Sequence, residues 1–327
     1  MTARFTALAL GTLLLGVLLL FPWLASSYAL SMATLILYLA TLSQAWNLMM
    51  GFAGQLSLGH ALYVGIGAYA AGALFFHFGI SPWLGVWLAI ACALAVALLL
   101  GVLAFRFGIS GVHFALLTIA FAEFTRVAFD HLDWLGGPGG MFLEVAQRDR
   151  WDVAHFRGPP SMFYYAALLL AAGTLGCCTW LSRSRAGYYW RAIREDEPAA
   201  QALGIDTFRW KLLAVLLSAG LSSVAGVFLA FYQNSLFPEQ LFHISRSIEI
   251  LLGSVIGGVG TLLGPIIGSL VLTLISDGAT ELLTMLGWEL PGTKQVLYGL
   301  TLLGVVVFLP QGIWPALHQR LARRSSP

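Results

Sequence analysis

The feature that most constrains this chain is a succession of apolar segments, each nearly free of charge and about 20 residues long, the length an α-helix needs to cross a bilayer. These segments lie at about 7–25, 30–50, 61–78, 84–105, 111–129, 161–181, 212–232 and 296–314. Only 10% of all residues are charged and 59% are apolar, whereas about a quarter of the residues in soluble domains are charged. This excess of apolar residues excludes a soluble enzyme or a nucleic-acid-binding protein. We predict an all-α polytopic membrane protein, because lipid cannot satisfy the hydrogen bonds of non-helical backbone.

The number of spans depends on the region 247–286, which is apolar but interrupted by glycines. This region is too long for one span and fits either two short spans or a re-entrant hairpin followed by a span. Together with the other apolar segments it predicts eight to ten transmembrane helices, some of them broken by glycine. We expect them to form a single transmembrane domain that covers residues 1–327.

The basic residues predict how the chain is oriented, because Lys and Arg accumulate on the cytoplasmic side of membrane proteins. They are frequent in 182–211 and in the C-terminal tail, so we place both in the cytoplasm. Counting spans backwards puts 130–160, with a tight loop at Gly136–Gly140, in the periplasm and the N-terminus in the cytoplasm. The first apolar run and the small residues at 25–27 resemble a secretory signal. We expect the run to be retained, since its loss would make the span count odd.

The positions of the polar residues exclude several kinds of catalysis. A P-loop ends in Gly-Lys-Ser/Thr, and neither of the two lysines, Lys211 and Lys294, lies in that context. The histidines are scattered, and Cys92, Cys177 and Cys178 lie in apolar runs without metal-ligand spacing. We expect no enzymatic activity, no metal and no cofactor in this chain.

A first polar interruption, residues 47–60, joins two apolar runs without a single formal charge. Transporters place unwound backbone of this kind where it lines a cavity. We therefore predict that this segment lines the substrate pathway, and the alternative is helix packing through its small residues. The polar side chains expected to face the pathway are Asn47, Gln55, Ser57 and His60.

A second interruption, residues 253–268, is rich in glycine. Glycines spaced four apart let helix backbones approach closely, and Pro265 should break the helix together with the glycine pair at 257–258. We expect this segment to form the packed wall opposite the first break, so that the two halves of the chain carry corresponding breaks, as in an internal repeat. The pathway residues predicted on this side are Gly257, Gly258 and Gly260.

Ionisable residues inside apolar segments are costly and face the protein interior. Glu123 and Arg126 are three residues apart on one predicted helix and can form a buried ion pair, which we interpret as structural rather than as part of a proton relay. Arg246 and Glu249 have the same spacing and can pair likewise. A further pair of acidic residues, at 277 and 281, has no obvious local partner.

The only long cytoplasmic segment, 182–211, carries the start and stop signals of a short helix. Asp196 can cap it, Pro198 suits the first helical turn, and Gly204 suits the residue after the end. Within it, Ala199-Ala200-x3-Gly204 resembles the coupling-loop motif of ABC-importer permeases, although Pro198 stands where that motif has Glu. The resemblance implies contact with a separate ATPase subunit through Arg194, Glu195, Glu197, Ala199, Ala200 and Gly204.

Longer segments resemble the branched-chain amino-acid permeases within that group. The matching segments follow the order of the family and lie at 47–69, 117–126, 136–140, 189–204 and 257–268. The resemblance implies a multi-pass subunit of the bacterial inner membrane that works with a second homologous permease, two subunits that bind ATP and a periplasmic substrate-binding protein. Leucine, isoleucine and valine would be the substrates.

Two alternatives to this function remain open at the level of sequence. Relatives of these permeases carry urea or another small amide or amino acid, and composition does not separate these substrates. An ion-coupled secondary transporter would use broken helices in the same way, with Asp277 and Glu281 holding the coupling ion.

Overall fold

The computed structural model describes residues 16–143, 151–285 and 292–325, and these are largely helical. Within these described ranges, six helical segments are long and apolar enough to cross a membrane, and they coincide with six of the predicted spans. This confirms an all-α polytopic membrane protein. The six segments are α2 with its continuation η1 (Ser27–Phe52), α3 (Ala61–Phe78), α4 (Pro82–Arg106), α5 (Gly111–Asp130), α6 (Pro160–Arg183) and α9 (Thr207–Gln233).

The other predicted spans are shorter in the structure or lie partly outside the described residues. The region 247–286 falls on two helices, α11 (Ile244–Gly257) and α12 (Gly264–Met285). The last predicted span corresponds to α13 (Thr293–Phe308), which is followed by α14 (Ile313–Ser325). Of the first predicted span, 7–25, residues 16–25 are described, and 16–24 of them are helical. The total of eight to ten spans and the cytoplasmic position of both termini therefore stay predictions.

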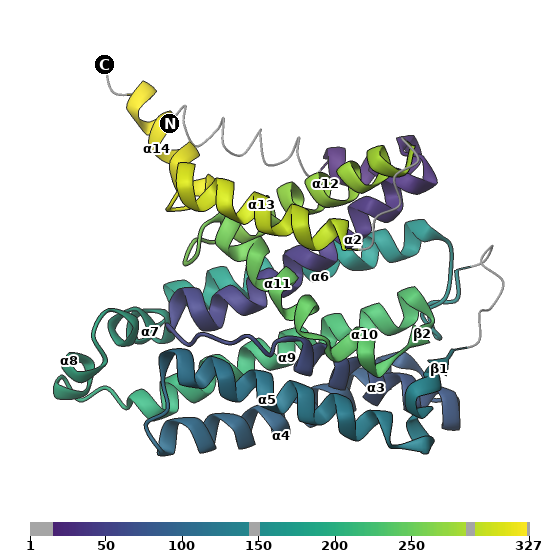
Figure 1. Cartoon of the computed structure of the whole chain (residues 1–327), viewed down its shortest axis with the longest axis horizontal. Coiled ribbons are helices and arrows are strands. Elements are labelled where there is room, and N and C mark those ends of the chain that lie inside the picture. The colour runs from purple at the N-terminus through teal and green to yellow at the C-terminus, as the bar shows by residue number, and fades with distance from the viewer. Residues whose placement is uncertain (1–15, 144–150, 286–291, 326–327) are drawn as a thin grey trace.

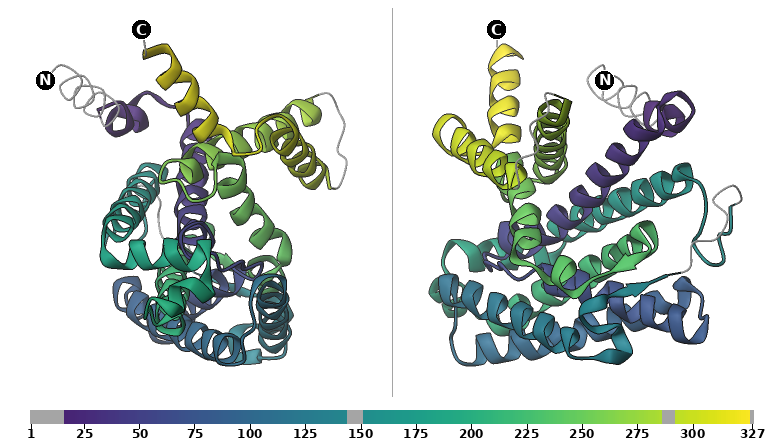
Figure 2. Two further views of the ribbon diagram at one scale, coloured as in Figure 1. Left: turned by 90° about the vertical axis from the view of Figure 1, so that its left-hand side faces the viewer. Right: turned by 45° about the vertical axis from the view of Figure 1, so that its right-hand side comes forward.

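The two ends of the helix bundle carry different short elements (Figure 1). At one end lie α7 (Arg185–Glu195) and α8 (Glu197–Ala202), and at the other lies a small antiparallel sheet of β1 (Met141–Phe142) and β2 (Ser235–Leu236). Helix α2 packs against α6 and α9 and also against α11 and α12, so it connects the first pair of helices to the second. The views in Figure 2 show α13 and α14 standing apart from α3, α4 and α5.

Small residues let α9 pack closely on α3 and α4. On α4, Ala89, Ala93, Ala97 and Ala104 are fully buried and share one face of the helix. A Cβ atom added to Gly226 of α9 would collide with the carbonyl oxygen of Val64 on α3. Close backbone approach of this kind is typical of membrane helices, where small residues provide the packing surface.

The segment between α5 and α6 confirms the predicted tight loop. Two short 3-10 turns, Asp133–Leu135 and Gly137–Gly139, precede β1. Gly136, Gly137 and Gly140 have positive φ angles, which glycine adopts without steric cost. After β2 the chain continues into the five-residue helix α10 (Pro238–Phe242), which contacts both α5 and α3.

Candidate translocation and coupling sites

The first predicted break is present in the structure. Helix α2 ends at Asn47, continues as a single π-helical stretch, η1 (Leu48–Phe52), and gives way to non-helical backbone that reaches α3 at Ala61. Such π-helical stretches are rare and are frequent at functional sites. Gly54 has φ +71° in the non-helical part, a conformation that favours glycine.

The second break lies directly against the first. Asn47 bridges them, since its Oδ1 accepts a hydrogen bond from the backbone N–H of Gly260 (2.7 Å) and its Nδ2 donates one to the carbonyl of Thr261 (2.8 Å). A Cβ atom added to Gly51 would lie 2.6 Å from the Gly260 nitrogen. The two glycine-broken segments, which are more than 200 residues apart in sequence, therefore form one contact, here called the break crossing (Asn47–Gly54 and Gly257–Gly264).

The glycines of the second segment hold α11 against α12, as their spacing predicts. Gly258 has φ +121° and ends α11, and α12 begins at Gly264. Cβ atoms on Gly257 or Gly268 would collide with the carbonyl oxygens of Gly264 and Gly253 respectively. This confirms the predicted break at 257–258 and the close packing of the two helices.

The other polar residues of the first break are buried inside the subunit. His60 Nε2 lies 2.8 Å from Ser218 Oγ on α9, and its Nδ1 lies 3.4 Å from Ser57 Oγ. Gln55 Nε2 donates to the carbonyl of Ala53 (2.9 Å). Asn47, Gln55, Ser57 and His60 are each at most 6% exposed. Their role in the substrate pathway stays a prediction.

The short helix predicted within residues 182–211 is confirmed as α8. Asp196 Oδ1 accepts a hydrogen bond from the N–H of Ala199 (3.0 Å), Pro198 lies in the first turn, and Gly204 follows the end with φ +83°. The carboxylate of the half-buried Glu197 forms an ion pair with the buried Lys211 of α9 (2.6 Å). Glu195, Ala199 and Gly204 are exposed, whereas Ala200 is buried.

Arg194 reaches from α7 to the break crossing, which the sequence did not predict. Its guanidinium donates a hydrogen bond to the carbonyl of Gly51 in η1. A Cβ atom on Gly54 would lie 3.0 Å from Arg194 Cγ, and one on Gly260 would lie 2.8 Å from Arg194 Nη1. Glycine at these two positions therefore makes room for the Arg194 side chain between the two broken segments.

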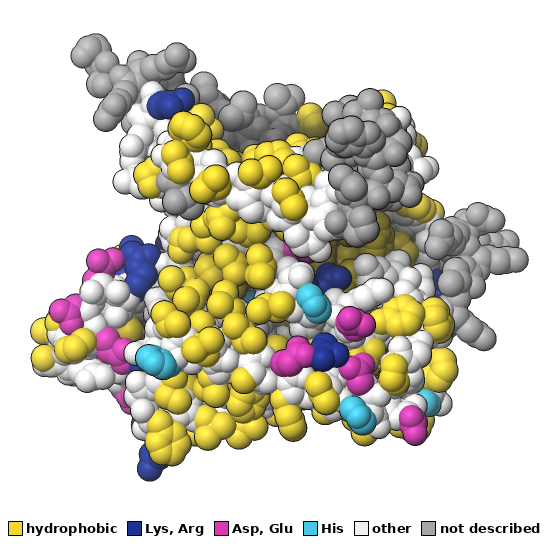
Figure 3. Space-filling view, viewed as in Figure 1, with side chains coloured by type: hydrophobic (Ala, Val, Ile, Leu, Met, Phe, Trp, Pro, Cys, Tyr) yellow, Lys and Arg dark blue, Asp and Glu magenta, His cyan; other side chains and the backbone are white. Residues whose placement is uncertain are grey.

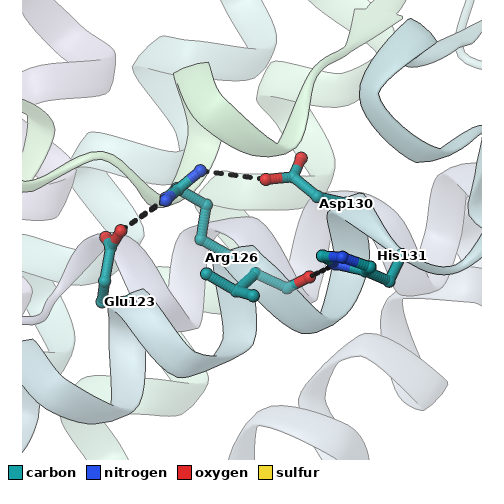
Figure 4. A network of polar contacts seen from close by, with 5 residues as sticks. Glu123, Arg126, Asp130 and His131 are labelled. Atoms are coloured by element: carbon teal, nitrogen blue, oxygen red, sulfur yellow. Dashed lines mark hydrogen bonds and ion pairs between the residues drawn. The ribbon is translucent and has the colours of Figure 1, made fainter.

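The predicted ion pair of α5 forms, but it is not buried. Arg126 Nη2 lies 2.5 Å from Glu123 Oε1, and Arg126 Nη1 lies 2.9 Å from Asp130 Oδ2, a third member that the sequence analysis missed (Figure 4). The side chain of Glu123 is 52% exposed and that of Arg126 is 24% exposed. Within the described structure, the pair therefore lies at the surface of the bundle and not in its interior.

The second predicted pair, between Arg246 and Glu249 on α11, is wrong. Arg246 Nε donates to the carbonyl of Gln240 (3.2 Å), and Glu249 Oε1 accepts from the hydroxyl of Tyr298 on α13 (2.9 Å). Both side chains line a cavity of about 760 Å³, together with Asp130, Glu239 and His243. Among the acidic residues proposed for a coupling ion, Asp277 is half-buried, and the side chain of Glu281 lies outside the described residues.

Comparison with known proteins assigns the family. The sequence model of the family described as "Branched-chain amino acid transport system / permease component" matches residues 28–306. The high-affinity branched-chain amino acid transport system permease protein LivM of Escherichia coli (strain K12) is 30% identical over 325 residues, which cover 92% of this chain and 73% of LivM.

No solved structure matches the chain significantly. Two shorter sequence matches are to permease proteins of transport and import systems. The autoinducer 2 import system permease protein LsrC of Klebsiella pneumoniae subsp. pneumoniae is 32% identical over 59% of this chain and 54% of LsrC. The branched-chain permease protein LivH of Salmonella typhimurium is 30% identical over 42% of each chain. The chain is therefore a multi-pass membrane protein that belongs to the branched-chain amino acid transport system permease family.

Proposed function

We propose that this chain is a membrane-spanning subunit of an ATP-driven importer that moves leucine, isoleucine and valine across the bacterial inner membrane. The observation that carries the proposal is the family match over residues 28–306, reinforced by the similarity to LivM over most of both chains. The chain has no P-loop of its own, so the energy of ATP comes from partner subunits. This assigns the chain a transport role and no enzymatic activity.

The proposed complex contains a second homologous permease, two ATP-binding subunits and a periplasmic binding protein, with both termini of this chain in the cytoplasm. We assign the contact with the ATPase to α8 and its flanks. Glu195, Ala199 and Gly204 are exposed there, and the apolar side chain of Leu203 is 81% exposed. An exposed leucine on a capped, charged helix suits a protein partner.

The break crossing supplies a mechanical route from this contact into the membrane. Arg194 lies two residues before Asp196, the N-cap of α8. The guanidinium of Arg194 donates a hydrogen bond to the carbonyl of Gly51. The ion pair between Glu197 and Lys211 fixes α8 to α9. A displacement of α8 by the ATPase would therefore move both α9 and the broken segments, where Asn47, Gln55, Ser57 and His60 are proposed to open toward the pathway.

The decisive experiment reconstitutes the complex in proteoliposomes with its ATPase subunits and binding protein, and measures uptake of radiolabelled leucine. We expect uptake only when ATP is present on the side of the ATPase subunits and leucine-loaded binding protein is present on the opposite side. Uptake of urea without uptake of leucine would reassign the substrate to the amide alternative. Leucine uptake driven by an ion gradient in the absence of ATP would favour a secondary transporter instead.

A further inference from the structure

Charged side chains of α5 lie on the surface of the bundle within a candidate membrane span. Glu123 and Arg126 belong to the segment Gly111–Asp130, and the side chain of Glu123 is 52% exposed. Ionisable side chains within a membrane span are costly against lipid and almost always face protein or a water-filled cavity. This flank of α5 is therefore turned toward the translocation pathway or a partner subunit and not toward lipid.

The same flank contains the cavity of about 760 Å³ formed by the end of α5, α10, the start of α11 and α13. Its volume lies in the range of about 300–1,000 Å³ that is typical of small-molecule sites. Figure 3 shows acidic, basic and histidine side chains gathered over α5 and α10, with hydrophobic side chains around them. Phe237 adds an apolar surface to the lining.

The cavity holds charges of both signs that do not neutralise one another. Arg246 and Glu249 are three residues apart on α11, yet they form no ion pair. Among the described residues, neither Glu239 nor Glu249 has a basic side chain within ion-pair distance, and Arg246 has no carboxylate. Asp130 is different, because Arg126 already pairs with it.

Separated, unneutralised charges in a cavity are costly unless a ligand or water satisfies them. A free amino acid carries a carboxylate and an ammonium group joined through one carbon atom, so it presents a counter-charge for Arg246 and one for Glu249 and Glu239, which form no ion pair among the described residues. An inorganic anion would satisfy only Arg246, and a simple cation would satisfy only the carboxylates. The arrangement therefore suits a zwitterion with an apolar side chain.

We propose that this cavity is an amino-acid recognition site of the permease, in which Arg246 binds the substrate carboxylate and Glu249, with Glu239, binds the ammonium group. The proposal rests on the function proposed above and adds a site to it. Helix α11 carries Arg246 and Glu249 near its start and ends at Gly257 in the break crossing. Ligand contact at one end of α11 is thus connected through one rigid helix to the segment that Arg194 contacts.

The test uses the complete reconstituted complex with saturating, leucine-loaded binding protein, and it measures initial leucine uptake and ATP hydrolysis. Arg246→Gln and Glu249→Gln should each lower uptake at least about tenfold, the effect expected from losing one charge-assisted hydrogen bond. Asp152→Asn is the matched control, because it removes one carboxylate from the segment between α5 and α6 outside the cavity. It should leave uptake unchanged.

A charge exchange separates recognition from a structural role. Arg246→Glu and Glu249→Arg should each abolish uptake, whereas the double variant restores one charge of each sign and should recover uptake to within about threefold of the wild-type rate. All variants are first checked for assembly and for ATP hydrolysis, so that a misfolded subunit is recognised.

The outcomes distinguish this site from the proposed function. A wild-type complex that fails to take up leucine refutes the proposed substrate. A wild-type complex that takes up leucine, with Arg246→Gln and Glu249→Gln variants that work at full rate, refutes only the recognition site. Loss of uptake in Glu249→Gln with full uptake in Arg246→Gln would also overturn it, because the cavity would then bind a cation and not a zwitterion.

Discussion

Replacing Arg194 with alanine should uncouple ATP hydrolysis from transport. Arg194 is the side chain of α7 that reaches the break crossing, where its guanidinium donates to the carbonyl of Gly51. The substitution removes this contact and leaves a gap between Gly54 and Gly260, which both lie against the Arg194 side chain. It leaves untouched the ion pair between Glu197 and Lys211 that fixes α8 to α9.

The size of the effect follows from the contact that is lost. A hydrogen bond from a charged donor contributes about 1.5–3 kcal/mol to the state that contains it. The Arg194 side chain is 36% exposed, so solvent competes for the guanidinium and we adopt the lower end, about 1.5 kcal/mol. This corresponds to about a tenfold change in the equilibrium between conformations of the broken segments. Arg194→Lys should change this equilibrium less than Arg194→Ala does, because lysine keeps the positive charge but lacks the planar guanidinium.

The assay is the number of leucine molecules taken up per ATP hydrolysed in the reconstituted complex. We expect this ratio to fall about tenfold in Arg194→Ala while hydrolysis continues. Arg191→Ala is the matched control, because Arg191 lies on the same helix and its donor contacts among the described residues go to the carbonyls of Gly187 and Ser182, outside the break crossing. An unchanged ratio in Arg194→Ala, or an equal fall in both variants, would refute the reasoning.

Three further predictions concern α8, the helix packing and the pathway. Gly204→Pro should abolish coupled uptake with normal membrane insertion, because proline cannot adopt φ +83°; normal uptake and substrate-stimulated hydrolysis would contradict the assignment of α8. Gly226→Ala should destabilise the subunit by about 1–3 kcal/mol through its collision with the carbonyl of Val64, whereas Gly220→Ala on the same helix, which meets no atom closer than 3.9 Å, should not; equal thermal stability of the two variants would argue against the α3–α9 contact. Cysteines placed at 47, 55, 57 and 60 in a background without Cys92, Cys177 and Cys178 should react with water-soluble thiol reagents in at least one nucleotide state, and silence at all four positions in an active transporter would assign them to packing.

Local chemistry made much of the fold predictable. Apolar length located the six long spans, and the capping signals at Asp196, Pro198 and Gly204 located α8. The glycines at 257 and 258 located the break between α11 and α12. Each of these features depends on residues that are close in sequence, so periodicity and turn chemistry are sufficient to find them.

The missed features all depend on contacts between distant segments. Nothing near Arg194 in the sequence indicates that its side chain turns toward Gly51, which is 143 residues away. Arg246 and Glu249 have the spacing of a helical pair, but Gln240 and Tyr298 take up their hydrogen bonds. Spacing along one helix shows which side chains can meet, and only tertiary packing decides which of them do.

The central claim is that the two glycine-broken segments form one unit that moves with α8 through Arg194. Hydrogen–deuterium exchange of the complete complex, compared between nucleotide-free and ATP-trapped states, tests it most directly. We predict that amides in 47–60 and in 257–264 change their protection together, and that Arg194→Ala reduces the change in both while Arg191→Ala leaves it intact. A change confined to one of the two segments, or a coordinated change that persists in Arg194→Ala, would contradict the claim.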